Sequence, residues 1–185
     1  MRCGAFRDGA VGLPGTKMKR SRANALIFVI TAAAAILVDQ VAKALVVAYV
    51  ETGRSITLIP HVLHLTHSTN AGAAFGILKG SGQIVFLAAL VVIGLTVAWF
   101  FAFRQKMSAG SFVGLGLIIG GALGNLIDRV VRPNHQVVDF LDLGWWPVFN
   151  IADIAIVAGV IIVVLVTALE LWREETDNPE YTEVL

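Results

Sequence analysis

Long apolar runs, separated by short polar stretches, are the main pattern along this chain of 185 residues. A helix needs about 20 apolar residues to cross a bilayer. Four runs reach that length, and they lie at about 23–50, 83–103, 111–131 and 149–172. The pattern therefore predicts an α-helical integral membrane protein with four transmembrane helices.

The first run follows the basic sequence KMKRSR at 17–22, a layout shared by secretory signal peptides and first membrane anchors. Because its apolar character continues past Asp39 and Lys43, we favour an uncleaved helix. Asp39 and Lys43 are four residues apart, the spacing of an intrahelical ion pair. Either they neutralise each other near the end of the span, or they take part directly in a site. Met18 is an alternative translation start.

A polar segment at about 51–82 separates the first two runs. It mixes β-branched residues with partial alternation of polar and apolar positions, so we predict one or two short strands that break at Pro60. A turn of small residues follows from Asn70, where the backbone could be approached closely. The segment is thus predicted to form a small β-rich unit outside the spans.

Three histidines recur at every third position of that segment, at His61, His64 and His67. On a strand this spacing would place His64 on the opposite face from the other two. No carboxylate or cysteine lies within the cluster to complete a metal site. We therefore expect surface histidines and no metal ion.

The most informative stretch is 120–157, where polar side chains interrupt apolar surroundings. Its polar residues next to predicted spans are Asn125, Asp128, Arg129, Asp139, Asn150 and Asp153. The first three lie on one face of a helix. Ionisable groups at the edge of a span are costly, so a functional site is the default interpretation. We expect a structural role for the adjacent Asp128 and Arg129, and helix packing for the GxxxG of Gly120 and Gly124.

Composition and charge narrow the class of protein. The chain is 57% hydrophobic, 15% charged and carries a net charge of +1, without a basic cluster interleaved with aromatic residues, so we expect no nucleic-acid partner. The single cysteine, Cys3, excludes an internal disulfide and a cysteine-based metal site. Basic residues gather before the first span, after the second and after the fourth. This bias predicts cytoplasmic termini, with Asp139 and Asp153 near the outer face.

Two carboxylates that approach closely share one proton and titrate as a unit. The ionised partner can take a proton from water, and the protonated partner can polarise a carbonyl or protonate a leaving amine. Asp139 and Asp153 could form such an aspartic-protease pair if the loop between them folds back. The residues alone also allow a proton or cation carrier, or a scaffold in which the acids pair with Lys43, Arg129 or Arg132.

Five motifs, taken in order and spacing, resemble those of the lipoprotein signal peptidase (signal peptidase II) family. They are Asp39-Gln40 with Lys43, NAGAAF at 70–75, GGALGNLIDR at 120–129, VVDF at 137–140 and FNIAD at 149–153. The resemblance extends over about 23–172, which is effectively the whole membrane body. It favours the peptidase over the carrier and the scaffold.

The resemblance implies an aspartic endopeptidase of the bacterial cytoplasmic (inner) membrane. Such an enzyme removes signal peptides from diacylglyceryl-modified prolipoproteins, cutting before the lipidated cysteine, and uses neither a cofactor nor a metal. Its partners would be lipid-modified prolipoproteins and membrane lipids, and we expect a monomer. The segment at about 51–82 would form a small extracytoplasmic β-rich cradle.

Carried over residue by residue, the resemblance implies a catalytic dyad of Asp139 and Asp153. The residues expected to bind substrate or support the site are Asp39, Lys43, Asn70, Gly72, Asn125, Asp128, Arg129 and Asn150. We expect three parts along the chain: a disordered cytoplasmic segment at 1–22, a four-helix peptidase domain at 23–172, and an acidic cytoplasmic tail at 173–185.

Overall fold

The computed structural model describes residues 14–70, 91, 94, 98 and 107–176. Its elements, in chain order, are α1 (Pro14–Tyr49), β1 (Ser55–Ile59), β2 (Leu63–Asn70), α3 (Ala109–Val131), the short 3₁₀ helix η2 (Pro133–His135), β3 (Val137–Asp142) and α4 (Ile151–Thr176). Three long helices therefore combine with one small sheet.

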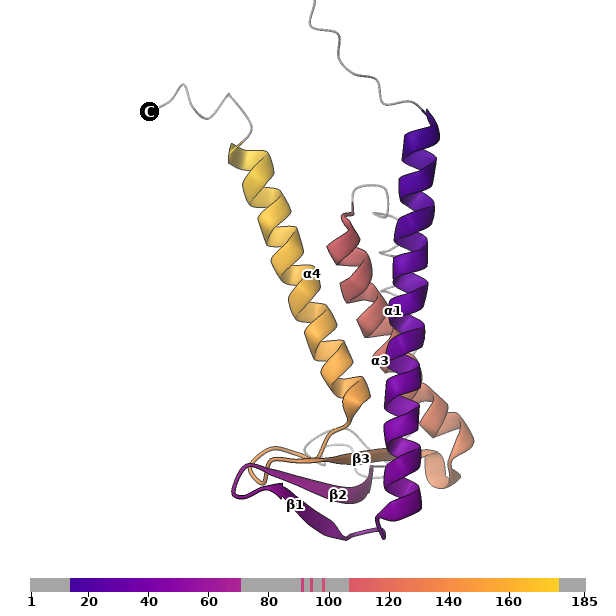
Figure 1. The fold of residues 1–185 in the computed structure, drawn as a ribbon, viewed down its shortest axis with the longest axis vertical. Coiled ribbons are helices and arrows are strands. Elements are labelled where there is room, and N and C mark those ends of the chain that lie inside the picture. The colour runs from indigo at the N-terminus through magenta and orange to yellow at the C-terminus, as the bar shows by residue number, and fades with distance from the viewer. Residues whose placement is uncertain (1–13, 71–90, 92–93, 95–97, 99–106, 177–185) are drawn as a thin grey trace, which may run out of the picture.

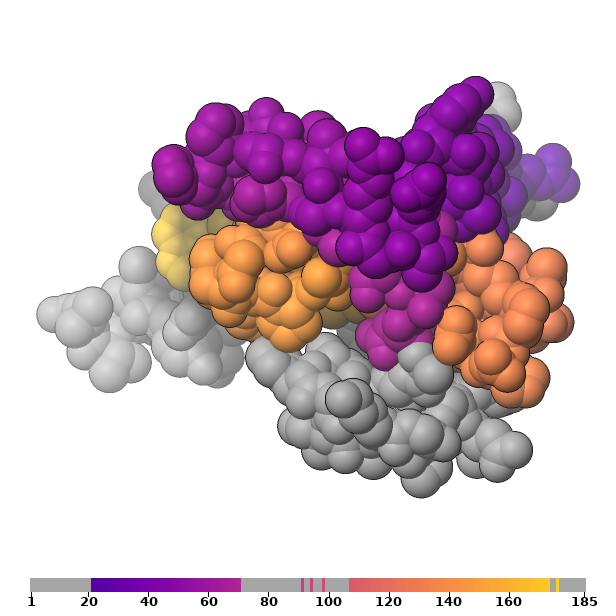
Figure 2. Space-filling model, turned by 90° about the horizontal axis from the view of Figure 1, so that it is seen from below, coloured from indigo at the N-terminus to yellow at the C-terminus, as the bar shows by residue number. Residues whose placement is uncertain are grey.

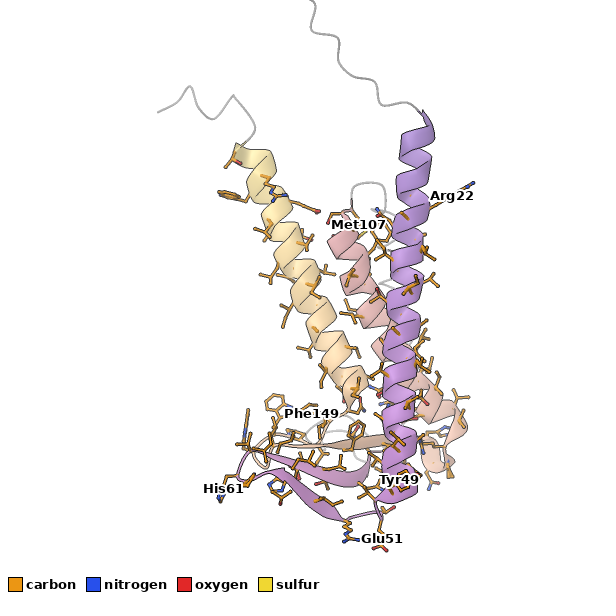
Figure 3. All side chains as sticks on the ribbon, in the orientation of Figure 1. Arg22, Tyr49, Glu51, His61, Met107 and Phe149 are labelled. Atoms are coloured by element: carbon orange, nitrogen blue, oxygen red, sulfur yellow. The ribbon has the colours of Figure 1, made fainter. Side chains whose placement is uncertain are left out.

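The helices stand side by side, and the sheet lies across one end of them (Figure 1). α3 packs against both α1 and α4. Arg22 and Met107 lie at the end opposite the sheet, whereas Tyr49 and Phe149 lie at the sheet end (Figure 3). α1 and α3 thus run toward the sheet, and α4 runs away from it.

Three helices are long and apolar enough to cross a membrane, over Ser21–Tyr49, Ala109–Val131 and Ile151–Arg173. α3 is the most buried of them, while α1 and α4 expose many large apolar side chains, which in a membrane can face lipid. The expected span at 83–103 lies outside the described residues, apart from three isolated helical positions. The described residues therefore contain three of the four expected spans.

Glycines let α3 approach both neighbouring helices closely. A Cβ added to Gly120 would lie 2.7 Å from the carbonyl oxygen of Ala32 in α1, and one added to Gly124 would lie 2.7 Å from Oδ2 of Asp39. On the other side, a Cβ at Gly121 would collide with the carbonyl oxygen of Ala152 in α4. The packing role expected for Gly120 and Gly124 is confirmed.

The sheet is antiparallel, with the order β1-β2-β3. β1 and β2 lie on either side of Pro60, where we predicted one or two short strands with a break at this proline. β3 was not predicted, and it pairs with β2 so that Asp139 lies opposite Ser68. Figure 2, seen from the sheet end, shows the segment from α1 to β2 (indigo to magenta) lying against the segment around β3 (orange).

One face of the sheet packs against the last turns of α1. Val46 and Val50 of α1 form a buried cluster with Val138 and Phe140 of β3. Such burial contributes about 1.5–3 kcal/mol for each large apolar side chain. This cluster holds β3 at the end of the bundle and leaves Asp139, between two of its members, on the opposite face.

The prediction of surface histidines is right for His61, which is exposed, and wrong for His67. The His67 side chain is 5% exposed, and its Nδ1 donates to the carbonyl of Val50 at 2.6 Å. The carbonyls at the end of a helix need external donors. His67 supplies one from β2, so its burial follows from the way the strand docks against α1.

The helices extend beyond the expected domain boundaries. α1 begins at Pro14, so residues 14–22 are helical where we expected disorder. Proline suits the first position of a helix, and the lysines and arginines that follow are good helix formers. α4 continues to Thr176, four residues into the expected tail. Residues 1–13 and 177–185 lie outside the described part of the chain.

Candidate active site

The amino end of α4 is fixed by a reciprocal pair of hydrogen bonds. The Asp153 backbone N–H donates to Oδ1 of Asn150 at 3.0 Å, and the Asn150 backbone N–H donates to Oδ2 of Asp153 at 3.1 Å. This is the capping-box arrangement, which satisfies two amides that the helix leaves unpaired. The same carboxylate lies at the positive end of the helix dipole, where negative charge is stabilised.

Asp139 lies on β3 and is held from two other elements. Asn150 donates from Nδ2 to Oδ1 of Asp139 at 2.6 Å, and Asn70, the last residue of β2, donates from Nδ2 to Oδ2 at 3.1 Å. The Asp139 side chain is 5% exposed. Its carboxyl is thus held between the end of β2 and the start of α4.

The fold-back of the loop after β3 brings Asn150 to Asp139. Phe149 exchanges two backbone hydrogen bonds with Leu141, at 2.8 and 3.0 Å. Gly144 makes the turn with a φ of 77°, in the left-handed region that favours glycine. Trp145 and Trp146 are exposed on this loop. The loop therefore folds back, which was the condition that we set for a carboxylate pair.

Asn125 of α3 completes the connection between the two aspartates. Its Nδ2 donates to Oδ1 of Asp153 at 2.9 Å, and its Oδ1 accepts from Nδ2 of Asn150 at 3.1 Å. An unbroken chain of hydrogen bonds therefore runs from Asp139 through Asn150 and Asn125 to Asp153. Asn70, Asn125 and Asn150, all expected at the site, contact one or both aspartates.

Burial, and after it the negative charge of Asp153, raises the pKa of Asp139 from 3.8 to about 6. The hydrogen bonds from Asn70 and Asn150 and the charge of Lys43 act in the opposite direction. The charge of Asp153 therefore favours the protonated form of Asp139, as expected where two carboxyls lie close together. Such a pair offers a base and an acid at the same place.

The remaining charged residues form a buried cluster beside the pair. Lys43 lies 2.8 Å from Oδ2 of Asp39 and 3.1 Å from Oδ2 of Asp128. Arg132 lies 3.0 Å from the other oxygen of Asp128. The ion pair expected between Asp39 and Lys43 is confirmed. Asp39 also accepts from the backbone N–H of Ala152 at 2.9 Å, which connects α1 to the amino end of α4.

Asp128 and Arg129 have different surroundings despite being adjacent. Oδ2 of Asp128 accepts from the backbone N–H of Val138 at 3.1 Å, which agrees with its expected structural role. Arg129 donates from Nη1 to the backbone carbonyl of Asn125 at 3.2 Å, and its charge also interacts favourably with Asp139 and Asp153. Arg129 is thus part of the surroundings of the pair.

Gly72, which we expected at the site, lies outside the described residues. Gln40 was part of a quoted motif but received no role; its Nε2 donates to the carbonyl of Gly124 at 3.0 Å, beside Asp39. The only hint in the sequence was its position next to an intramembrane acid. Within the described residues, no group of three His, Cys, Asp or Glu side chains is placed to hold a metal ion.

Comparisons with known proteins agree on one family. The family model described as "Signal peptidase (SPase) II" matches residues 31–169. The lipoprotein signal peptidase of Syntrophomonas wolfei is 45% identical over 140 residues, covering 76% of this chain and 91% of the relative. That of Rhodococcus jostii is 41% identical over 155 residues, covering 82% and 76%. That of Mycobacterium leprae is 35% identical over 175 residues, covering 89% and 86%.

The fold is similar to solved structures as well. A bacterial membrane enzyme determined by the in meso method at 2.3 Å resolution matches with a TM-score of 0.68 and 31% identity, covering 90% of this chain and 94% of the other. A second bacterial membrane enzyme, determined at 1.9 Å, matches with a TM-score of 0.65 and 32% identity, covering 83% and 92%. The arrangement of helices and sheet therefore has experimental counterparts among membrane enzymes.

Proposed function

The chain belongs to the signal peptidase II family, and on this premise we propose that its catalytic groups are the carboxyls of Asp139 and Asp153. Members of the family remove signal peptides from prolipoproteins, and this protein is a membrane peptidase with that activity. The observation that carries the residue assignment is the chain of hydrogen bonds from Asp139 through two asparagines to Asp153.

The surroundings suggest a different role for each carboxyl. Asp153 accepts hydrogen bonds from the Asn150 backbone and from Asn125 at the positive end of a helix, so it is the ionised base. Asp139 is the acid, because burial and the charge of Asp153 favour its protonated form. Raising its pKa to about 6 keeps that form accessible near neutral pH.

Peptide hydrolysis then proceeds through a tetrahedral intermediate. Water attacks the carbonyl carbon of the cleaved bond while Asp153 takes a proton from it, and Asp139 gives its proton to the carbonyl oxygen. On collapse, the proton on Asp153 passes to the leaving nitrogen as the C–N bond breaks. Asp139 regains a proton from the hydroxyl as the new carboxyl group forms. The pair returns to its starting state without another reactant.

The scaffold alternative is disfavoured by the partners of these acids. In the described part of the chain, the salt bridges to lysine and arginine are made by Asp39 and Asp128. Asp139 and Asp153 are instead held by amide groups. Acids that serve only to neutralise buried cations would be paired with them. The two acid pairs thus have separate roles.

We propose that the substrate carries a diacylglyceryl group and that the cut precedes its lipidated cysteine. The candidate site lies at the sheet end of the helices, at the edge of the spans. An apolar signal peptide can remain in the bilayer while its end reaches that level, and membrane lipid would surround both molecules.

A fourth crossing is supported by the direction of the helices. α1 ends beside the sheet and α3 begins at the opposite end, so the chain must return between them. We propose that 83–103 makes this crossing. The excess of basic residues near the termini supports cytoplasmic ends and an outward-facing site in the cytoplasmic membrane. The test is labelling of Thr57→Cys by an impermeant thiol reagent after Cys3 has been replaced by serine. Labelling from the cytoplasmic side alone would contradict this orientation.

The experiment that tests the assignment is cleavage of a diacylglyceryl-modified prolipoprotein by the purified protein in detergent. Asp139→Asn and Asp153→Asn should each lower kcat about 100- to 10,000-fold while remaining folded, because each removes the acid or the base. Asp142→Asn is the matched control on the same strand, and it should cleave at the parent rate. Retention of cleavage by both of the first two variants would exclude the pair.

A further inference from the structure

We propose that Lys43 is a positioning residue for the reaction. It fixes the orientation of the Asn125 side-chain amide, which in turn holds Asp153. The inference rests on the proposed catalytic pair and assigns one of its supports. Lys43 belongs to α1, whereas Asp139 and Asp153 belong to β3 and α4. It makes no described hydrogen bond to either reacting carboxyl. Its charge acts on Asp139 through space, and its bonded path to Asp153 runs through Asn125.

The amide of Asn125 has two possible orientations, because its oxygen and nitrogen exchange places when it rotates by half a turn. In the structure Nδ2 faces Oδ1 of Asp153 at 2.9 Å and donates to it. In the opposite orientation the amide oxygen would face the carboxylate, and two acceptors would repel each other. Asp153 is therefore held by Asn125 in one orientation only.

Lys43 selects that orientation. Its Nζ lies 2.9 Å from Oδ1 of Asn125, and an ammonium group can donate but not accept. If the amide turned round, its NH₂ would face the ammonium, and two donors would oppose each other. Asn150 also donates to Oδ1 of Asn125, at 3.1 Å. That donor is another side-chain amide, however, and it lacks the charge of Lys43.

The ammonium has no freedom to turn away. Lys43 is fully buried, and its three donors match three acceptors: Oδ2 of Asp39 at 2.8 Å, Oδ2 of Asp128 at 3.1 Å and Oδ1 of Asn125 at 2.9 Å. A buried lysine is costly unless it is paired and hydrogen-bonded. Asp39 and Asp128 offset that cost, and together they direct the third donor to Asn125.

The same cluster also fixes the backbone that carries Asp153. Oδ1 of Asp39 accepts from the N–H of Ala152, the residue that precedes Asp153. α1 therefore holds Asp153 in two ways, through Ala152 at the backbone and through Lys43 and Asn125 at the carboxylate. These contacts explain why α1, which carries neither reacting carboxyl, contains the buried ion pair of Asp39 and Lys43.

The test is a double-mutant cycle on kcat for a diacylglyceryl-modified prolipoprotein, with Lys43→Met and Asn125→Ala. Each single variant should lower kcat about 10- to 100-fold, the usual cost of misplacing a reacting group by about 1 Å, with KM changed less than about threefold. The double variant should be scarcely slower than either single one, because both remove the same support. The proposal would be overturned if the fold-decrease in kcat of the double variant equalled the product of the two single decreases. A folded Lys43→Met variant with the parent kcat would also overturn it.

Removing Lys43 alone leaves two buried carboxylates with one partner fewer, and this could unfold the protein. The cycle is therefore repeated in an Asp39→Asn background, in which Lys43→Met leaves Asp128 paired with Arg132. Arg132→Gln is the matched control, because Arg132 shares Asp128 with Lys43 but is not bonded to Asn125. It should lower thermal stability and keep the parent kcat. If the unmodified protein did not cleave the prolipoprotein at all, the proposed function itself would be contradicted.

Discussion

At the scale of single residues, the surroundings of Asp139 and Asp39 explain why two buried acids differ. Asp39 faces the ammonium of Lys43 and a backbone amide, so its charge is matched within the fold. Asp139 accepts hydrogen bonds from the neutral side-chain amides of Asn70 and Asn150, and the carboxyl of Asp153 lies near it. The charged form of Asp139 is thus disfavoured in the fold, and ionisation of this acid should lower the stability of the protein.

Stability should depend on pH through Asp139. Its pKa is raised from 3.8 to about 6 on folding, so the stability present below pH 4 is lost as the pH rises through about 6. The loss approaches about 3 kcal/mol at neutral pH. Asp139→Asn, which cannot ionise, should remove most of that loss and raise Tm at pH 7.5.

Thermal unfolding in detergent at pH 4 to 8 measures this effect. The curves of Tm against pH for the parent and Asp139→Asn should separate between about pH 4 and about pH 6 and remain apart at higher pH. Asp142→Asn, on the same strand, should follow the parent. Parallel curves for the parent and Asp139→Asn would show that ionisation of Asp139 does not oppose folding.

The sequence indicated which polar residues to consider for the site, but not the contacts that the structure shows between them. Asp139 and Asp153 stand out because acids are rare near apolar spans. The asparagine connection was not predicted, since Asn125 and Asn150 come from different helices and meet only after folding. The capping box at Asn150 and Asp153 was visible as a three-residue spacing, but we interpreted it only as a polar opening of the fourth span.

At the scale of elements, close helix packing allows α1 to reach the site. Gly124 faces Asp39, and a Cβ at this position would lie 2.7 Å from Oδ2 and 3.3 Å from Cγ of that carboxylate. The carboxylate cannot move aside easily, because it holds both Lys43 and Ala152. Only a residue without a side chain fits here.

Gly124→Ala should therefore destabilise the protein by about 1–3 kcal/mol, the usual cost of overpacking. Gly94→Ala is the matched control, since a Cβ at that helical glycine meets nothing within 4 Å. Tm in detergent measures both variants. The packing argument fails if Gly124→Ala is as stable as Gly94→Ala.

β1 and β2 were predictable because they are neighbours in sequence with a clear break at Pro60. β3 was not, because its partner strand lies about 70 residues earlier in the chain. Val138 and Phe140 are buried by α1, and a short apolar stretch of this kind does not reveal its partner. A strand that depends on distant pairing must be identified from the fold.

At the scale of the whole molecule, the structure combines a membrane bundle with a sheet that closes one end. α3 lies between α1 and α4, and the sheet supplies Asp139 and Asn70 to the point where the three helices meet it. The apolar pattern predicted the spans of α1, α3 and α4 to within a few residues. It could not predict how they assemble around the aspartates, since lipid-facing and helix-facing apolar residues look alike in a sequence.

Infrared titration of the Asp139 carboxyl tests whether Asp139 and Asp153 form one coupled acid–base unit. The protonated carboxyl band is assigned by its loss in Asp139→Asn and then followed with pH in the parent and in Asp153→Asn. We predict a midpoint near pH 6 in the parent and a lower midpoint in Asp153→Asn, because the charge of Asp153 raises the pKa of Asp139. The same midpoint in both proteins would contradict the coupling and, with it, the proposed mechanism.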